Sequence, residues 1–280
     1  MSARNIAVVT GTTHGIGRVT SRELARAGYT VVMLCRNQPA AARLREELRV
    51  LLPRSDIHAV HCDLASLASV RACADTVRRD FGRLALLINN AGMVSTIRRR
   101  SPDGLELCFA TNHLGPFLLT RLLLDRLSPA GRIINVASWV HYGARLNLPS
   151  IDARRAHYSP TQAYAQSKLA NVMFTLALAR RLEGHDITVN CLHPGLVASN
   201  LLPLWLRAFY RLTGRPMIDA ERGARTNLYL ALSTEVAGLS GRYFDERQRE
   251  RPASAFARDV QQQELLWEQS ERWTGLSPLP

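Results

Sequence analysis

The feature that most constrains this sequence is an alternation of short apolar runs with helical patterns through its first two thirds. The runs are rich in Val, Ile and Leu, and amphipathic stretches such as 17–28, 41–52 and 69–82 separate them. Strands that are apolar at almost every position are covered on both faces, as happens when helices flank a parallel sheet. The chain is therefore expected to form an α/β fold with a doubly wound parallel sheet. The strand candidates are 6–10, 29–35, 57–63, 84–90, 131–138 and 187–194.

The later part of the sequence departs from this rhythm. Residues 196–220 interrupt it and are expected to form a small substrate lid over the edge of the sheet. A last helix is expected at about 221–233 and a short strand at 241–244. Residues 246–280 are expected to be a polar C-terminal tail with one short helix that carries Trp267.

The composition is that of a folded protein without secretory or membrane-spanning features. The chain has 280 residues, of which 46% are hydrophobic and 21% charged, enough to bury a core in one large domain. We expect that domain over 1–245. The N-terminus has no apolar stretch of signal-peptide length, and no segment approaches the roughly 18 apolar residues of a membrane span. A cytoplasmic location without a transmembrane segment is the resulting expectation.

The charge and the cysteines argue against two classes of binding site. The net charge is +13, but the arginines form short pairs and one triplet, 98–100, scattered among acids without interleaved aromatic residues. This distribution is typical of a solvated basic surface and not of a specific nucleic-acid site. The five cysteines are widely spaced with no CxxC pair, so neither a disulfide framework nor a metal site is expected.

The stretch TGTTHGIG, residues 10–17, follows the first strand candidate and opens the first helix. Its three glycines permit a tight turn, close approach of the backbone to a phosphate, and packing of the helix near the strand. The helix N-terminus adds amide donors and a favourable dipole, so a dinucleotide on a Rossmann-type sheet is expected. The spacing differs from the general GxGxxG fingerprint, and a structural turn without a ligand is the alternative. The candidate cofactor contacts here are Gly11, Thr13, His14, Gly15, Ile16 and Gly17.

The end of the second strand candidate decides which dinucleotide is expected. An acidic residue there reads the ribose 2′-hydroxyl of NAD, whereas an arginine accommodates the 2′-phosphate of NADP. This chain has Cys35-Arg36-Asn37, with no Asp or Glu. Arg36 can pair with a phosphate and stack on adenine, so NADP(H) is favoured, with Asn37 and His14 as further candidate contacts. A surface arginine without a ligand is the alternative interpretation of Arg36.

Lys168, in YAQSK at 164–168, is the only lysine in the chain. Reduction of a carbonyl by hydride needs a proton donor at the oxygen, and oxidation of an alcohol needs a base. Residues four apart on a helix share a face, so Lys168 is expected beside Tyr164, where its charge favours the phenolate. Ser138, at the end of the fifth strand candidate, can donate to the substrate oxygen in the crevice where doubly wound sheets bind ligands. A solvated tyrosine and lysine on a helix surface is the alternative.

Several stretches together resemble the short-chain dehydrogenase/reductase family over about residues 5–245. They are TGTTHGIG, CDL (62–64), NNAG (89–92), NHLG (112–115), NVAS (135–138), YAQSK (164–168) and NCLHPG (190–195). The resemblance implies that Lys168 also holds the nicotinamide ribose and that Asn112 positions a water that relays protons to this lysine. The catalytic set it implies is Asn112, Ser138, Tyr164 and Lys168.

The same resemblance implies further cofactor contacts. Asp63 would touch the adenine, and Asn89, Ala91 and Gly92 would line the adenosine ribose and stabilise the sheet. In PGLVAS, residues 194–199, the Val197 backbone would approach the carboxamide, and Ser199 stands where the family usually has threonine. The remaining implied cofactor-binding residues are Asp63, Leu64, Asn89, Ala91, Gly92, Tyr164, Lys168, Pro194, Gly195, Val197 and Ser199.

Within the family, the sequence is most similar to the retinol-dehydrogenase and WW-domain-oxidoreductase subgroup, through CRN at 35–37, NHLG, and the closing stretch 221–246. The segment 201–212 is apolar and carries three aromatic residues, which suits a cover over a lipophilic substrate. Packing on the core or on a dimer partner, and a membrane-facing helix, are the alternatives for this segment.

The expected function is an NADP(H)-dependent oxidoreductase that interconverts an alcohol and a ketone or aldehyde on a lipophilic small molecule. A biosynthetic ketoreductase acting on a polyketide-type ketone and a non-catalytic NADP-binding scaffold or sensor are the alternatives. The resemblance leaves a homodimer and a tetramer open. The sequence leaves the substrate and the physiological direction open.

Overall fold

The computed structural model describes residues 5–151, 158–198 and 217–279. Within them, the chain forms one sheet with the strand order β3-β2-β1-β4-β5-β6-β7-β8. Neighbouring strands are parallel from β3 through β7, and only β8 runs antiparallel to its neighbour. The strands are β1 (Ile6–Thr10), β2 (Thr30–Cys35), β3 (Asp56–His61), β4 (Leu84–Asn89), β5 (Leu127–Val136), β6 (Ile187–Leu192), β7 (Tyr243–Phe244) and β8 (Glu250–Arg251).

This sheet confirms the expected α/β fold with a doubly wound parallel sheet. The six strand candidates are all strands; β5 begins four residues before its expected start, and the other ends agree within two residues. The short strand and last helix expected before residue 245 are present as β7 and α8. The helices are α1 (Gly15–Arg26), α2 (Gln38–Leu51), α3 (Leu67–Asp80), α4 (Leu107–Phe109), α5 (Gly115–Leu123), α6 (Pro160–Arg181), α8 (Ala220–Leu232), α9 (Ala255–Arg258) and α10 (Val260–Thr274).

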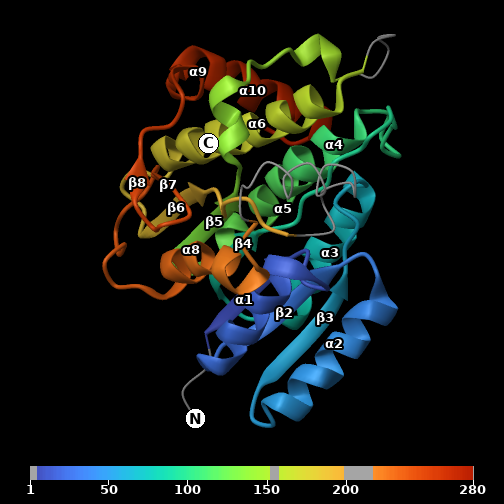
Figure 1. Ribbon diagram of the computed structural model, residues 1–280, viewed down its shortest axis with the longest axis vertical. Helices are drawn as coiled ribbons and strands as arrows, with labels where there is room; N and C mark the ends of the chain where they lie inside the picture. Colours follow the sequence, from blue (N-terminus) through green and yellow to red (C-terminus); the bar gives the residue numbers. More distant parts are fainter. Residues whose placement is uncertain (1–4, 152–157, 199–216, 280) are drawn as a thin grey trace.

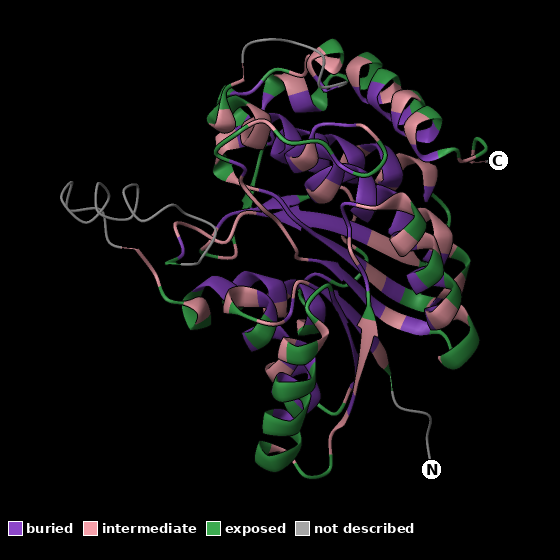
Figure 2. Cartoon of the chain, turned by 90° about the vertical axis from the view of Figure 1, so that its right-hand side faces the viewer, coloured by how far each residue is buried: buried purple, intermediate pink, exposed green. Residues whose placement is uncertain are grey.

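The sheet is buried on both faces because its strand residues alternate between two cores. Ala7 and Val9 of β1 belong to a core with α1, α2 and α8, whereas Val8 between them belongs to a core with α3, α5 and α6. Figure 1 shows these two groups of helices on opposite sides of the sheet. Figure 2 shows the buried residues gathered on the sheet and on the helix faces turned toward it. Burial on both faces explains why β1, β2 and β4 are apolar at nearly every position, whereas the edge strand β3 is only partly buried and contains polar residues.

The stretch 246–280, expected to be a polar tail, adds β8, α9 and α10 to the described structure. Helix α10 packs against α6 (Figure 1), and Trp267 on α10 is 3% exposed. The Trp267 indole donates to Glu271, which also accepts from Arg121 of α5. Some of the polar side chains in this stretch therefore bond to the rest of the protein, whereas others, such as Glu268, are exposed. The domain boundary at 245 stays a prediction.

One helical run among the described residues, Leu107–Arg126, has the length and composition needed to cross a membrane. Of its most apolar window, 72% is buried inside the protein, as in a core helix. The segment 201–212 and most of the expected lid, 196–220, lie outside the described residues.

Candidate active site

A cavity of about 720 Å³ lies at the carboxyl ends of β1, β4, β5 and β6. Turns and loops that follow these strands contribute its walls, together with the first turns of α6. This is the edge at which doubly wound sheets bind their ligands. The predicted site residues that line it are Gly11, His14, Gly15, Ile16, Gly17, Ala91, Gly92, Ser138, Tyr164, Lys168, Pro194, Gly195 and Val197.

The glycine turn after β1 is tight in a way that side chains would prevent. Gly11 has φ +69°, and a Cβ there would lie 2.8 Å from the Ala91 Cα atom. A Cβ on Gly17 would collide with the Gly11 carbonyl oxygen, so helix α1 begins directly against the end of β1. The His14 ring hydrogen-bonds the Thr13 hydroxyl (3.1 Å) rather than capping α1. The backbone amides of the first turn of α1 therefore border the cavity. In this position they are suited to donate hydrogen bonds to a phosphate.

Ser138 follows the buried strand β5 and is held in extended backbone geometry, with φ −160° and ψ 153°. It caps the short helical turn Trp139–Gly143, and its hydroxyl accepts from the Val140 amide (3.5 Å). Both Ser138 and the half-exposed Trp139 line the cavity. Ser138 thus presents a hydroxyl to the cavity from a rigid strand end.

Tyr164 and Lys168 lie one turn apart on α6 and both line the cavity. The helix begins at Pro160, after Ser159 accepts from the Gln162 amide (3.3 Å) as its cap. The Lys168 side chain is 2% exposed, and its Nζ donates to the Val136 carbonyl oxygen (2.8 Å) at the end of β5. This bond anchors the lysine to the same strand that leads to the serine.

The titration of this tyrosine–lysine pair is governed by burial. Burial raises the pKa of the Tyr164 phenol above its usual range, and an interaction with the Ser138 hydroxyl offsets part of the rise. Burial also lowers the pKa of Lys168 to about 8. The sequence led us to expect a Tyr164 pKa depressed by the lysine. In this structure the loss of hydration has the larger effect, so the phenol is protonated near neutral pH.

Asn112 lies in a π-helical turn, Ala110–Leu114, directly before α5. Its side chain exchanges two hydrogen bonds with the Met93 backbone, accepting from the amide (2.7 Å) and donating to the carbonyl (2.9 Å). It also donates to the Ser167 hydroxyl (2.9 Å) on α6. Asn112 is fully buried beside Gly92, where an added Cβ would lie 3.7 Å from its Oδ1. It therefore ties the loop after β4 to the helix that carries the tyrosine and lysine.

Asn89 and its neighbour Asn90 differ in position. Asn89 is buried in the sheet and donates to Thr120 (2.9 Å) and to Asn135 of β5 (2.8 Å). Asn90 lines the cavity, and its side chain donates to the Thr10 carbonyl (3.0 Å). The motif placed both residues at this strand end, but only the backbone register decides which side chain faces the cavity.

The remaining predicted cofactor contacts lie near the strand ends but outside the cavity lining. Arg36 and Asn37 are exposed after β2, where Asn37 caps α2 by accepting from the Ala40 amide (3.0 Å). Asp63 accepts from the Ala65 amide (3.0 Å) in the turn after β3, next to the buried Leu64. Ser199 lies outside the described residues.

Several lining residues were not identified from the sequence. They come from the loop after β4, the end of β5, the turn after Ser138, the start of α6 and the loop after β6. Neighbourhood in the sequence could have identified some of them, since Trp139 and Val140 directly follow the predicted site residue Ser138. The unpredicted lining residues are Asn90, Val94, Thr96, Val136, Ala137, Trp139, Val140, Pro160, Thr161 and Leu196.

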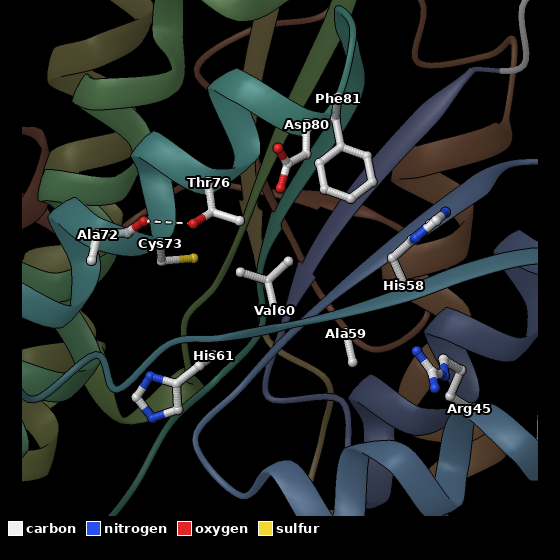
Figure 3. Close-up of a pocket in the computed structure, with 10 residues that line it drawn as sticks. All are labelled: Arg45, His58, Ala59, Val60, His61, Ala72, Cys73, Thr76, Asp80 and Phe81. Atoms are coloured by element: carbon white, nitrogen blue, oxygen red, sulfur yellow. Dashed lines mark hydrogen bonds between the residues drawn. The ribbon is translucent and has the colours of Figure 1, made fainter.

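A second cavity, of about 520 Å³, lies beside the edge strand β3 (Figure 3). Two of its polar side chains are engaged locally: His58 bonds to Asp56 (2.8 Å), and the Thr76 hydroxyl donates to the Ala72 carbonyl (3.0 Å). Among the described residues the two cavities share no lining residue, and the tyrosine–lysine pair belongs to the larger one. The larger cavity is therefore the candidate active site.

The described parts of the chain contain no cluster of side chains suited to bind a metal ion. Within residues 5–151, 158–198 and 217–279, no group of three or more His, Cys, Asp or Glu side chains is arranged to hold a metal ion. All five cysteines are buried and free.

A doubly wound sheet with a glycine turn and a tyrosine–lysine pair at one crevice defines an oxidoreductase of the dinucleotide-binding class. The chain belongs to the short-chain dehydrogenase family, whose sequence profile matches residues 5–205. Members of this family act on alcohols or carbonyls with NAD or NADP. Membership confirms the resemblance inferred from the ordered motifs.

Known relatives extend over nearly the whole chain. Human retinol dehydrogenase 14 is 40% identical over 290 residues, covering 96% of this chain and 86% of the relative. Human retinol dehydrogenase 13 is 38% identical over 279 residues, covering 96% and 84%. Dehydrogenase/reductase SDR family member 13 of Bos taurus is 42% identical over 280 residues, covering 97% and 74%. The similarity to the retinol-dehydrogenase subgroup is thereby confirmed.

Solved structures share the fold. An uncharacterised protein from Mycobacterium paratuberculosis is 35% identical with a TM-score of 0.80, covering 99% of this chain and 96% of that one. A protein described as an NAD(P)-dependent gluconate 5-dehydrogenase from Beutenbergia cavernae, with bound NADP, is 27% identical with a TM-score of 0.69. That match covers 88% of this chain and 96% of the other.

Proposed function

We propose that this protein is an NADP(H)-dependent oxidoreductase that interconverts an alcohol and a ketone or aldehyde on a lipophilic small molecule. The observation that carries the proposal is the presence of Ser138, Tyr164 and Lys168 in the lining of one cavity at the sheet crevice. These residues come from β5 and α6, and the Lys168–Val136 hydrogen bond joins the two elements.

In this mechanism Tyr164 is the acid and base. Its raised pKa keeps the phenol protonated near neutral pH, so it can donate a proton to the carbonyl oxygen in the reductive direction. The Ser138 hydroxyl orients and polarises the same oxygen. A bound dinucleotide would supply or accept the hydride at its nicotinamide.

Lys168 and Asn112 support the tyrosine. Lys168 takes up or releases a proton easily because burial lowers its pKa to about 8, close to the working pH of such a site. Asn112 lies near the lysine behind Gly92 and holds the intervening loop in place. Lys168 is therefore suited to return a proton to the phenol after each turnover, and Asn112 keeps the loop beside it in place.

The preference for NADP(H) rests on the exposed Arg36 at the carboxyl end of β2. No acidic side chain stands at that strand end to bind a ribose 2′-hydroxyl, because the sequence there is Cys35-Arg36-Asn37. An arginine at this point can form charge-assisted hydrogen bonds with a 2′-phosphate. The glycine turn would hold the pyrophosphate through the backbone amides of residues 15–17.

The lipophilic character of the substrate is supported by apolar side chains in the lining of the cavity. Val94, Trp139, Val140 and Leu196 contribute apolar surface to it. Pockets of this kind bind apolar ligands and orient them with a few polar groups. Two of the relatives above are named retinol dehydrogenases, and retinol is a lipophilic alcohol.

The test compares Tyr164→Phe with the wild type, measuring NADPH oxidation with a panel of lipophilic ketones and aldehydes. Loss of the proton donor should lower kcat/KM by at least about 100-fold while NADPH still binds. Tyr229→Phe is the matched control, since its hydroxyl bonds to Glu235 on the surface (3.0 Å). Turnover by Tyr164→Phe near the wild-type rate would refute the mechanism. Tight NADPH binding without turnover by the wild type would favour a cofactor-binding scaffold.

A further inference from the structure

A fully buried histidine stands directly behind Ser138. His141 is 0% exposed and lies in the same short helical turn, Trp139–Gly143. Its backbone amide (3.2 Å) and its ring Nδ1 (2.8 Å) both donate to the Ser138 carbonyl oxygen. One residue therefore holds the carbonyl of the proposed catalytic serine with two hydrogen bonds.

The second ring nitrogen has an equally definite partner. The Ser254 amide donates to His141 Nε2 (3.3 Å). A carbonyl oxygen only accepts and a backbone amide only donates, so the proton must be on Nδ1 and the lone pair on Nε2. The contacts at both ends of the ring therefore fix its tautomer and its orientation.

The ring is also fixed by packing. It lies against Tyr243 of β7 in an edge-to-face arrangement, with ring centres 4.7 Å apart, and against Tyr142 at 4.1 Å. Burial lowers the pKa of His141, which agrees with a neutral ring between two neutral backbone groups. No rotation of the imidazole is available without breaking a buried hydrogen bond.

These contacts link the candidate active site to the C-terminal segment. Ser254 caps α9, accepting from the Ala257 amide (3.2 Å). The same turn has a second link at the surface, where the Tyr142 hydroxyl donates to the Pro252 carbonyl (2.8 Å). His141 is thus the buried connection between the stretch 252–257 and the strand end that presents the serine.

We propose that His141 is a positioning residue, which sets the placement of the Ser138 hydroxyl through the Nδ1 hydrogen bond to the Ser138 carbonyl. This proposal rests on the function proposed above, because it assigns His141 a part in the reaction through Ser138. Catalysis is sensitive to displacements of about 1 Å in a group that contacts the reacting atoms. A histidine that only filled space in the core would not need the Nδ1 bond for turnover.

Two near-isosteric substitutions separate the two ring nitrogens. His141→Asn places an amide donor near the Nδ1 position and loses the acceptor for Ser254, whereas His141→Gln places an amide oxygen near Nε2 and loses the donor to Ser138. We expect His141→Gln to lower kcat by about tenfold, with the KM for NADPH within about twofold of wild type. His141→Asn should keep kcat within about threefold of wild type.

The melting temperatures should rank the two His141 variants in the opposite order from their kcat values. His141→Asn leaves the buried Ser254 amide without its partner and should have the lower melting temperature of the two. Tyr142→Phe is the control, since it removes the surface link to Pro252 and should leave kcat unchanged. A His141→Gln protein with wild-type kcat, or with a higher kcat than His141→Asn, would overturn the proposal.

Two further measurements separate this inference from the proposed function. Nitrogen NMR of the imidazole in the wild-type protein should show the neutral Nδ1–H tautomer; a predominant Nε2–H tautomer would overturn the proposal without any activity assay. Ser138→Ala tests the serine itself and should lower kcat at least about 100-fold. If Ser138→Ala is fully active, the proposed function fails regardless of the His141 variants.

Discussion

The Lys168 ammonium lies over the ring of Tyr164, with Nζ 5.8 Å from the ring centre. Its hydrogen bond goes to the Val136 carbonyl oxygen, so the cation is held against the strand. Burial shifts the two pKa values in opposite directions, upward for the phenol and downward to about 8 for the ammonium. Both shifts favour the neutral forms, so the phenol of Tyr164 stays protonated near neutral pH and has a proton to donate to a substrate oxygen.

The buried ammonium should lower the stability of the protein. Lys168→Met should raise the free energy of unfolding of the cofactor-free protein by about 1–3 kcal/mol at pH 7, while abolishing turnover. The folded-state pKa of Lys168, about 8, lies below its ordinary value of 10.5, so the unfolded chain binds more protons between these values. Wild-type stability therefore rises with pH in this window, and the advantage of Lys168→Met should shrink by about 2 kcal/mol at pH 9.5.

Denaturant unfolding at pH 7 and pH 9.5 measures this difference. Lys168→Arg is the matched variant, because its guanidinium stays charged and keeps its penalty at both pH values. An advantage of Lys168→Met that is the same at both pH values would contradict the assigned cause.

Arg36 should determine the preference between dinucleotides. Arg36→Asp removes the partner of a 2′-phosphate and introduces a carboxylate that can accept from a ribose 2′-hydroxyl. Affinity for NADP should fall by about 10- to 100-fold, as expected for lost charge-assisted hydrogen bonds, while affinity for NAD should rise. Calorimetric titration with both cofactors measures the change. Arg43→Asp, on the exposed face of α2, makes the same charge change and should alter neither affinity by more than about twofold.

The C-terminal helix should be part of the cooperative unit of the fold. Glu271 accepts from both the Arg121 guanidinium and the Trp267 indole, and the ion pair is nearly buried, with side-chain exposures of 6% and 9%. Glu271→Ala should lower the free energy of unfolding by about 3–5 kcal/mol, because it leaves Arg121 buried without its carboxylate. Glu268→Ala, on the exposed side of α10, should cost less than about 1 kcal/mol. Equal melting temperatures for the two variants would show that α10 is not coupled to the core.

The architecture could be predicted from the sequence because burial on both faces imposes a local composition. Most of the six strand candidates are apolar at nearly every position, and this property belongs to the segment itself; the edge-strand candidate 57–63, with His58 and His61, is an exception. The stretch 246–280 gave no such signal. Its buried Trp267 stands among polar residues, and one of these, Glu271, is satisfied by Arg121 from a distant helix. Local composition cannot report a partner about 150 residues away along the chain.

The candidate site also combines features that the local sequence predicts with features that depend on distant segments. The spacing of Tyr164 and Lys168 predicts their common helix face, and the position of Ser138 at a strand end predicts its edge of the sheet. The choice between Asn89 and Asn90 depends on the backbone geometry where β4 ends. The role we assign to His141 depends on the Ser254 amide, which only the packing of the C-terminal segment brings to the ring.

The sequence by itself determined the α/β sheet, its glycine turn and the identity of the chemical groups at its crevice, because strand burial, tight turns and helix periodicity act over a few residues. Tertiary structure decided which of those groups share a cavity, how the His141 ring is oriented, and in which direction the Tyr164 and Lys168 pKa values move. Desolvation and long-range hydrogen bonds set these properties, and both exist only once distant segments are packed together.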